Sequence, residues 1–218
     1  MIMRNKRCYQ SIIILLVIGL LFPLTIGEAA PILPAHDSSV LAQALLERLT
    51  PEERVGQLFL VTFTGPEAGA SSSASGLIYD LIVNHHIGGV VLEADNNNFL
   101  GGDQTISTLV SLADQIQRNE YNASLLPQEN PVTNEPFTPA FIPLFIAISQ
   151  DGDGYPYDQL LSGLTPLPSQ MALGATWSPE LARQVGNVLG NELAILGINM
   201  LLGPSLDVLE TSYSERGG

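Results

Sequence analysis

The sequence predicts an α/β fold with a parallel sheet, which looks like part of a (β/α)8 barrel of the TIM type. Short apolar segments typical of buried strands alternate with segments of helical periodicity, as expected for parallel strands joined by crossover helices. About four strands are predicted, over residues 58–63, 87–92, 143–148 and 198–202. Their near-continuous apolar character predicts burial on both faces of the sheet. Carboxylates follow three of these strands, which suits the polar mouth of a barrel over a packed core.

An open, doubly wound sheet gives the same alternation of strands and helices, and the pattern alone leaves both sheets possible. A doubly wound sheet commonly binds a dinucleotide through a G-x-G-x-x-G turn after its first strand. The residues after the predicted first strand contain no such turn, which weakens a dinucleotide-binding fold. No cofactor is predicted.

The composition bounds the class of partner. The chain has 218 residues, of which 45% are hydrophobic, and a formal net charge of −14. This length is enough for one domain with a sizeable core. The acidic balance argues against nucleic acid as a partner, because phosphate binding needs clustered lysine and arginine. No block of like charge occurs, so the acidity indicates a solvated surface.

Residues 1–29 have the pattern of an export signal peptide. A basic start precedes an apolar run over residues 12–26, and small residues around Ala29 offer a cleavage site. We expect cleavage after Ala29, export of the protein, and no stable membrane partner afterwards. The alternative is an uncleaved membrane anchor, but the apolar run is about 15 residues and contains Pro23, whereas a spanning helix needs about 20.

Removal of this segment would also remove Cys8, the only cysteine, and Lys6, the only lysine. Thiol catalysis, disulfides and thiolate metal sites then have no candidate residue. Schiff-base chemistry, which needs a lysine, has none either.

Helices are predicted before and between the strands. Residues 30–48 form a lead-in segment, with apolar residues at helical spacing over 39–48. Thr50, Pro51 and Glu53 then have the pattern of a capped helix start.

Three longer helices are predicted over residues 77–86, 106–116 and 178–197. The last begins with the N-cap pattern Ser178-Pro179-Glu180 and carries an apolar stripe that is predicted to be buried. Its Gly186 and Gly190 are predicted to allow a close neighbour. A proline-rich connection with little regular structure is predicted over residues 119–142.

Three features have both a structural and a ligand-binding interpretation. Asp151-Gly152-Asp153 begins like a calcium loop, but tyrosine and proline then occupy the positions of the next ligand and the glycine. His85 and His86 suit the negative end of a helix dipole, and no third metal ligand is spaced nearby. For Trp177, packing is favoured over a role as a sugar-stacking platform. No metal site is predicted.

Five motifs occur in order between Leu49 and Val208. They are IAISQDGDG, LPSQMALGAT, SPELARQVGNVLGNEL, ILGINM and GPSLDV. This series, at suitable spacing, resembles the N-terminal barrel of glycoside hydrolase family 3. LTPEERVGQLF and IGGVVL resemble the family's opening helix-strand and its second strand. MALGAT is similar to the β-N-acetylhexosaminidase branch, and ATWSPEL to the β-glucosidases.

The resemblance implies a retaining, exo-acting hydrolase of β-glycosidic bonds in carbohydrate metabolism, with a β-linked sugar as its partner. In the family, an aspartate nucleophile lies on a later strand. In the hexosaminidase branch, a His–Asp pair on a mobile loop serves as the acid/base. Both would fall beyond Gly218, so no catalytic residue is assigned to this chain.

The resemblance also points to four substrate-binding candidates. Ser149 stands where the family usually has a sugar-binding aspartate, and Asp151 stands where it has glutamate. Asp153 takes the place of a glycine, and either Asp151 or Asp153 is expected to supply the carboxylate that Ser149 lacks. Asp207 matches the aspartate of the family's P-x-x-D-V strand end, where it either shapes the site or contacts the substrate.

On this resemblance, residues 49–218 are expected to be an incomplete N-terminal barrel. We expect the 218-residue chain to be inactive and aggregation-prone, because unclosed edges of a parallel sheet expose hydrogen-bonding groups. The alternative from another class is an exported, non-catalytic carbohydrate-binding protein on the same scaffold. Ser149 in place of the usual aspartate supports that alternative.

Overall fold

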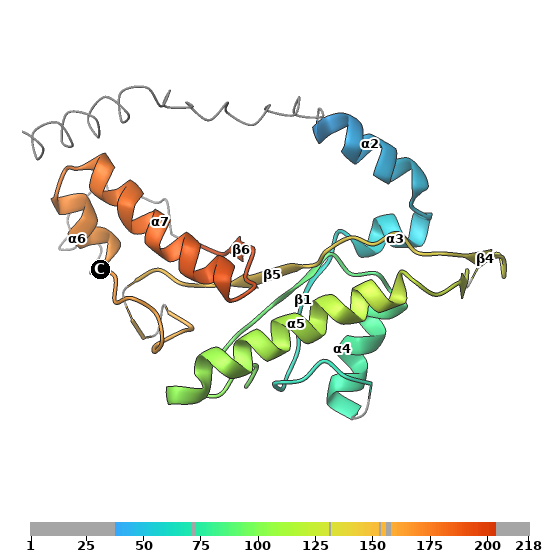
Figure 1. The fold of residues 1–218 in the computed structure, drawn as a ribbon, viewed down its shortest axis with the longest axis horizontal. Helices are drawn as coiled ribbons and strands as arrows, with labels where there is room; N and C mark the ends of the chain where they lie inside the picture. Colours follow the sequence, from blue (N-terminus) through green and yellow to red (C-terminus); the bar gives the residue numbers. More distant parts are fainter. Residues whose placement is uncertain (1–37, 71–72, 131, 153, 156–157, 204–218) are drawn as a thin grey trace, which may run out of the picture. The chain divides into compact units, whose positions relative to one another are not determined.

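The computed structural model describes residues 38–70, 73–130, 132–152, 154–155 and 158–203 (Figure 1). The chain divides into two units, Met1–Gln43 and Ala44–Gly218. Helix α2 (Ser38–Arg48) spans this division and confirms the helix predicted up to Arg48. The predicted signal peptide lies outside the described residues. Among the residues that are described, no helix has the length and apolarity needed to span a membrane.

A four-stranded parallel sheet organises the second unit, as predicted. Its strands are hydrogen-bonded in the order β1 (Leu60–Thr62), β2 (Gly89–Val91), β5 (Phe145–Ile148) and β6 (Met200–Leu201). Each strand is shorter than the apolar segment that predicted it. The order in space follows the order in the chain, without the reversal that divides a doubly wound sheet.

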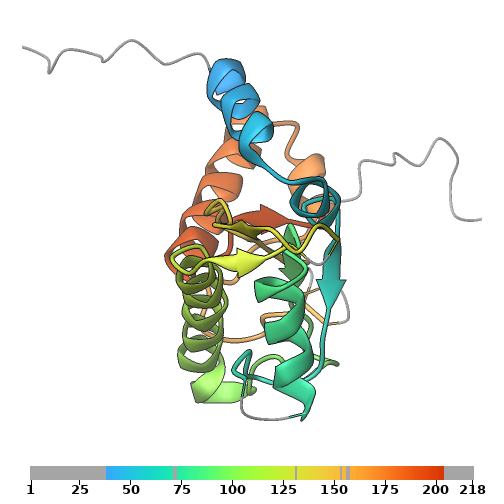
Figure 2. The same ribbon diagram turned by 90° about the vertical axis from the view of Figure 1, so that its right-hand side faces the viewer.

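Helices precede and connect these strands (Figures 1 and 2). They are α3 (Pro51–Gly56), α4 (Ser73–Val83), the single 3₁₀ turn Gly102–Gln104, α5 (Thr105–Ala123), α6 (Gln170–Ala175) and α7 (Pro179–Ile195). Figure 2 shows α4 and α5 running side by side along the sheet.

The capping pattern predicted at Thr50 is confirmed. The backbone N–H of Glu53 donates to Thr50 Oγ1 at 3.2 Å, and the backbone N–H of Thr50 donates to Glu53 Oε2 at 2.8 Å. These two bonds satisfy orphan donors of the first helical turn, so α3 begins at Pro51.

The core lies between one face of the sheet and the helices α4 and α5. Val61, Val90 and Ile146 stand in register on adjacent strands; Val90 and Ile146 belong to the buried apolar cluster, and the partly buried Val61 packs against it. The helices contribute a buried set at helical spacing: Ile78, Ile82, Leu109, Leu112, Ala113 and Ile116. This packing fixes the register of the sheet, because a one-residue slip would turn the cluster's strand residues to the opposite face.

The opposite face of the sheet is partly exposed, so the prediction of burial on both faces is wrong for the described residues. Leu60, Gly89 and Phe145 stand in register on this face. Leu60 is 42% exposed and Phe145 is 49% exposed. A Cβ on Gly89 would lie only 2.7 Å from Phe145 Cβ and 2.8 Å from Leu60 Cδ2. Glycine therefore allows the two large side chains to approach over the central strand.

Two elements differ from the prediction between residues 119 and 175. Helix α5 continues to Ala123, because Glu120 and Ala123 extend its buried face and the first proline comes only at Pro127. Beyond it, β3 (Gln128–Glu129) and β4 (Pro136–Phe137) form a short antiparallel pair within the connection that was predicted to be irregular. Helix α6 was not predicted, because six residues are too few for a periodic pattern.

Helix α7 begins as predicted, with the N–H of Leu181 donating to Ser178 Oγ at 3.2 Å. The prediction that its apolar stripe is buried holds only at the C-terminal end, where Leu193 and the C-cap residue Leu196 are buried. By contrast, Leu181 and Val188 are each 39% exposed. A Cβ on Gly186 would meet no described atom within 4 Å. The described residues therefore cover the N-terminal part of this stripe incompletely.

Side-chain oxygens take the place of a neighbouring strand where the chain enters β5. The backbone N–H groups of alternate residues in the entering segment each donate to a side chain from α3 or α5. These bonds are Ala140 to Glu53 Oε1 (2.9 Å), Ile142 to Glu120 Oε1 (3.4 Å) and Leu144 to Gln117 Oε1 (3.1 Å). Glu53 therefore caps its own helix and also holds this distant segment.

Burial raises the pKa of Glu120 to about 7, and the nearby Glu53 carboxylate adds to the rise, while the Ile142 N–H opposes it. The side chain is almost fully buried, at 3% exposure. The folded state therefore binds a proton at Glu120 more tightly than the unfolded state does. Stability is present in full below the unfolded pKa and falls as pH rises towards the folded pKa.

We expect Glu120→Gln to stabilise the protein at pH 8 by up to about 3 kcal/mol and to have little effect at pH 4. The amide keeps an oxygen that accepts from Ile142 and carries no buried charge. Urea unfolding of the variant and the unmodified chain between pH 4 and 8 measures the difference. The exposed Glu135→Gln is the control. An equal pH dependence for Glu120→Gln and the unmodified chain would contradict the prediction.

Candidate functional site

The parallel sheet brings the loops after its strands to one edge, and a buried asparagine joins the first two of them. Asn98 Nδ2 donates to the carbonyl oxygens of Phe63 at 2.9 Å and Gly65 at 3.0 Å. Its Oδ1 accepts from the N–H of Glu93 at 2.9 Å. The side chain is fully buried, so these bonds fix the β1 loop against the β2 loop.

A glutamine side chain joins the β2 loop to the β5 loop. The backbone N–H of Ala94 donates to Gln159 Oε1 at 2.8 Å, and the backbone N–H of Gln159 donates to the Ser149 carbonyl at 3.2 Å. In the β2 loop itself, Asn96 Nδ2 donates to Glu93 Oε2 at 2.6 Å. Three consecutive strand ends are thus connected by hydrogen bonds.

The β5 loop is held by two buried side chains that sequence reasoning missed. Gln150 makes a reciprocal pair with the backbone of Leu160, donating at 3.0 Å and accepting at 2.9 Å. The carboxylate of Asp158 accepts hydrogen bonds from three backbone N–H groups of the loop. No sequence pattern identifies Gln150 or Asp158, because their hydrogen bonds form only when the loop folds back on itself.

The predicted substrate-binding residues fall into two groups. Ser149 and Asp151 are half-buried at the carboxyl end of β5. Asp153 and Asp207 lie outside the described residues. The Asp151 carboxylate lies against Gly203, at the start of the β6 loop, where a Cβ would overlap it. The fold therefore brings Asp151 to the segment that leads towards Asp207.

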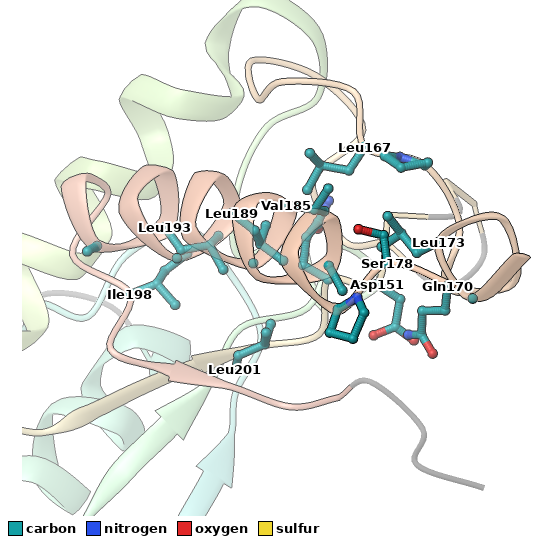
Figure 3. Close-up of a pocket in the computed structure, with 18 of the residues that line it drawn as sticks. Asp151, Leu167, Gln170, Leu173, Ser178, Val185, Leu189, Leu193, Ile198 and Leu201 are labelled. Atoms are coloured by element: carbon teal, nitrogen blue, oxygen red, sulfur yellow. The ribbon is translucent and has the colours of Figure 1, made fainter. Parts of the chain in front are cut away.

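A pocket of about 790 Å³ opens beside this loop, between α6, α7 and β6 (Figure 3). Asp151 and Gln170 lie together at one end, and Leu193 and Ile198 lie at the other. Along α7 the lining repeats small residues every fourth position: Ala182, Gly186, Gly190 and Ala194. Apart from its polar end, the pocket suits an apolar polypeptide segment better than a sugar, whose hydroxyl groups need polar partners.

Trp177 is not packed against the described residues, which contradicts the favoured interpretation. Its side chain is 92% exposed at the rim of this pocket, and its φ of 52° is unusual for a bulky residue. The N–H of Trp177 donates to the Gly174 carbonyl at 3.1 Å, which holds the turn between α6 and α7.

The two histidines lie at the other end of the sheet, away from these loops. Helix α4 ends at Val83, so the predicted boundary at His86 is three residues late. His86 is buried edge-on against Phe137, with ring centroids 6.1 Å apart, and burial lowers its pKa. His85 lies 3.5 Å from the carboxylate of Asp80. Among the described residues, no three His, Cys, Asp or Glu side chains gather as metal ligands would.

Comparison with known protein families shows which family this fold belongs to. Residues 50–218 match the family described as "Glycosyl hydrolase family 3 N terminal domain". The chain belongs to this family. The described α/β fold, whose strand-end loops lie at one edge of a parallel sheet, therefore belongs to the family's N-terminal domain.

Curated relatives carry glycosidase names. The chain is 26% identical over 181 residues to a "Beta-N-acetylglucosaminidase/beta-glucosidase" of Cellulomonas fimi, an alignment that covers 83% of this chain and 25% of the relative. It is also 26% identical to "Beta-hexosaminidase A" of Pseudoalteromonas piscicida, with 78% and 27% covered. The chain thus spans about a quarter of the length of these relatives.

A solved structure is similar as well. A glycoside hydrolase family 3 β-N-acetylglucosaminidase from Paenibacillus sp. str. FPU-7 matches with a TM-score of 0.55 and 31% sequence identity. The match covers 73% of this chain and 25% of that one. This likeness supports the α/β fold and the family assignment together.

We expect Asn98→Ala to lower the free energy of unfolding by about 3 kcal/mol. The substitution removes the side-chain partner of three buried or half-buried backbone groups, namely the N–H of Glu93 and the carbonyls of Phe63 and Gly65. Asn96→Ala, which removes a single bond from a half-buried residue, is the matched control and should cost under about 1 kcal/mol. Urea unfolding at pH 7 measures both. Equal losses in the two variants would contradict the prediction.

Proposed function

We propose that this chain provides part of the substrate-binding domain of a retaining, exo-acting β-glycosidase of the β-N-acetylhexosaminidase or β-glucosidase type. The observation that carries the proposal is the family match over residues 50–218. The names of the relatives from Cellulomonas fimi and Pseudoalteromonas piscicida support the substrate class, a β-linked sugar. No observation on the described residues or among the relatives favours the alternative of a non-catalytic carbohydrate-binding protein.

The proposal includes the barrel: the four strands form half of a (β/α)8 barrel. Chain order and spatial order agree across the sheet, as they do around a barrel. Leu58, at 82% exposure, joins Leu60 and Phe145 as apolar residues that a closed barrel would cover. Apolar pockets also flank both edge strands, at Leu201 of β6 and, in a second pocket of about 780 Å³, at Val61 of β1.

Within this proposal, the residues of this chain bind sugar and do not perform the chemistry. Asp151 and Ser149 present a carboxylate and a hydroxyl at the carboxyl end of β5, where sugar hydroxyl groups can donate to them. Asp153 and Asp207 are proposed to join them at the same edge. The catalytic aspartate and the acid/base group are assigned to none of the described residues.

We also propose that residues 1–29 direct export, on the basis of their sequence pattern. N-terminal sequencing of the protein recovered from the medium or cell envelope tests this directly. A first residue at Ala30 supports cleavage, and an intact Met1 supports the membrane-anchored alternative.

A chimeric enzyme tests the glycosidase proposal. Residues 50–218 replace the corresponding segment of the Paenibacillus β-N-acetylglucosaminidase, and hydrolysis of p-nitrophenyl N-acetyl-β-glucosaminide and of p-nitrophenyl β-glucoside is measured. We expect turnover of at least one substrate by the chimera and none by the 218-residue chain alone. A folded chimera that hydrolyses neither substrate overturns the proposal.

Asp151→Asn in the chimera is expected to lower kcat/KM by about 10- to 100-fold, the cost of about 1.5–3 kcal/mol for a hydrogen bond to a charged group. Asp103→Asn, an exposed carboxylate on the turn before α5, is the matched control and should leave kcat/KM unchanged. Equal activity of Asp151→Asn and the parent chimera would remove Asp151 from the site.

A further inference from the structure

The loop after β5 folds around a carboxylate from its own chain. The backbone N–H groups of Asp151 and Gly152 donate to Asp158 Oδ1 at 2.6 and 2.8 Å. The N–H of Gly154 donates to Asp158 Oδ2 at 2.8 Å. The N–H of Asp158 in turn donates to the Gly154 carbonyl at 2.9 Å. Both carboxylate oxygens therefore accept hydrogen bonds from the described part of this loop.

Two glycines of this loop have left-handed backbone conformations. Gly152 has a φ of 91° and Gly154 a φ of 74°, conformations that L side chains rarely adopt. Such positions turn neighbouring N–H groups towards a common centre and create an anion-binding nest. Asp158 is 8% exposed and occupies this nest. The nest therefore holds a built-in anion rather than an open site.

The nest holds the backbone next to Asp151. On one side of Asp151, the bonds between Gln150 and Leu160 fix the backbone. On the other side, Asp158 holds the N–H groups of Asp151 and Gly152. On this backbone, the Asp151 carboxylate lies against Gly203 at the start of the β6 loop.

We propose that Asp158 is the positioning residue of the substrate-binding loop: by filling the backbone nest it fixes the Asp151 carboxylate for hydrogen bonding to a sugar hydroxyl. This inference rests on the proposed function. Asp158 itself need not touch the sugar. The three hydrogen bonds that its carboxylate accepts from described residues all come from the loop that carries Asp151, and the side chain lies outside the apolar core cluster.

Chemical rescue tests the inference on the full 218-residue chain. Asp158→Ala empties the nest, and formate, a small carboxylate, can fill it again. Hydrogen exchange of the peptide spanning residues 149–160 is followed by mass spectrometry with and without formate, against chloride at equal ionic strength. Methyl N-acetyl-β-glucosaminide is then titrated, and the protection it gives to the same peptide yields an apparent Kd.

We expect Asp158→Ala to exchange about tenfold faster in this peptide and to bind the sugar about tenfold more weakly, the loss of about one strong hydrogen bond. Formate should restore both the slow exchange and the affinity. Asp103→Ala, an exposed carboxylate on another loop, should change neither and should not respond to formate. Restored exchange without restored affinity would leave Asp158 a merely structural residue and overturn the inference, as would the absence of any formate effect.

If Asp158→Ala unfolds the protein, hydrogen exchange rises throughout the chain and not only in residues 149–160. In that case the experiment is repeated with Asp158→Asn. The asparagine keeps one acceptor oxygen but presents an NH₂ group to one of the donors, so local exchange and sugar affinity should still change. A fully native Asp158→Asn overturns the inference. If the unmodified chain gives no sugar protection while formate still rescues exchange in Asp158→Ala, the proposed sugar binding by Asp151 in this chain fails, and the substrate role of Asp158 falls with it. The glycosidase proposal itself is decided by the chimera.

Discussion

The parallel register of the four strands is the constraint on which the rest of this unit depends. Val61, Val90 and Ile146 align on one face and pack against α4 and α5, so the sheet cannot slip without exposing its core. Because all strands run the same way, every strand-end loop is delivered to the same edge. Polar loops that are far apart in the sequence therefore meet in one candidate site.

Short strands leave many backbone groups unpaired at both ends of the sheet, and side-chain amides and carboxylates replace the missing partners. Asn98, Gln150 and Asp158 do this at the carboxyl ends, while Glu53, Gln117 and Glu120 do it where the chain enters β5. Backbone groups that are buried need such partners, so these polar residues are buried as well. The polar network at the site and the one at the opposite end therefore have the same physical origin.

Much of the fold followed from local patterns. The alternation of strands and helices predicted the parallel sheet, and the cap residues Thr50 and Ser178 marked two helix starts correctly. Predictions that depended on what covers a surface were less successful. The exposed side chains of Phe145, Leu181 and Trp177 contradict the burial expected from their apolar character, because an apolar residue indicates only that a partner surface is favourable.

The sequence by itself determined the family, the α/β class, the strand-end position of Ser149 and Asp151, and the substrate class to be tested. Only the tertiary structure decided which residues hold that edge in place. Asn98 binds Phe63 across 35 positions, and Ala94 binds Gln159 across 65. Asp158 is close to its partners in sequence, but its role requires the left-handed turns at Gly152 and Gly154. Local patterns encode periodicity and caps, whereas these contacts exist only once the chain has folded back on itself.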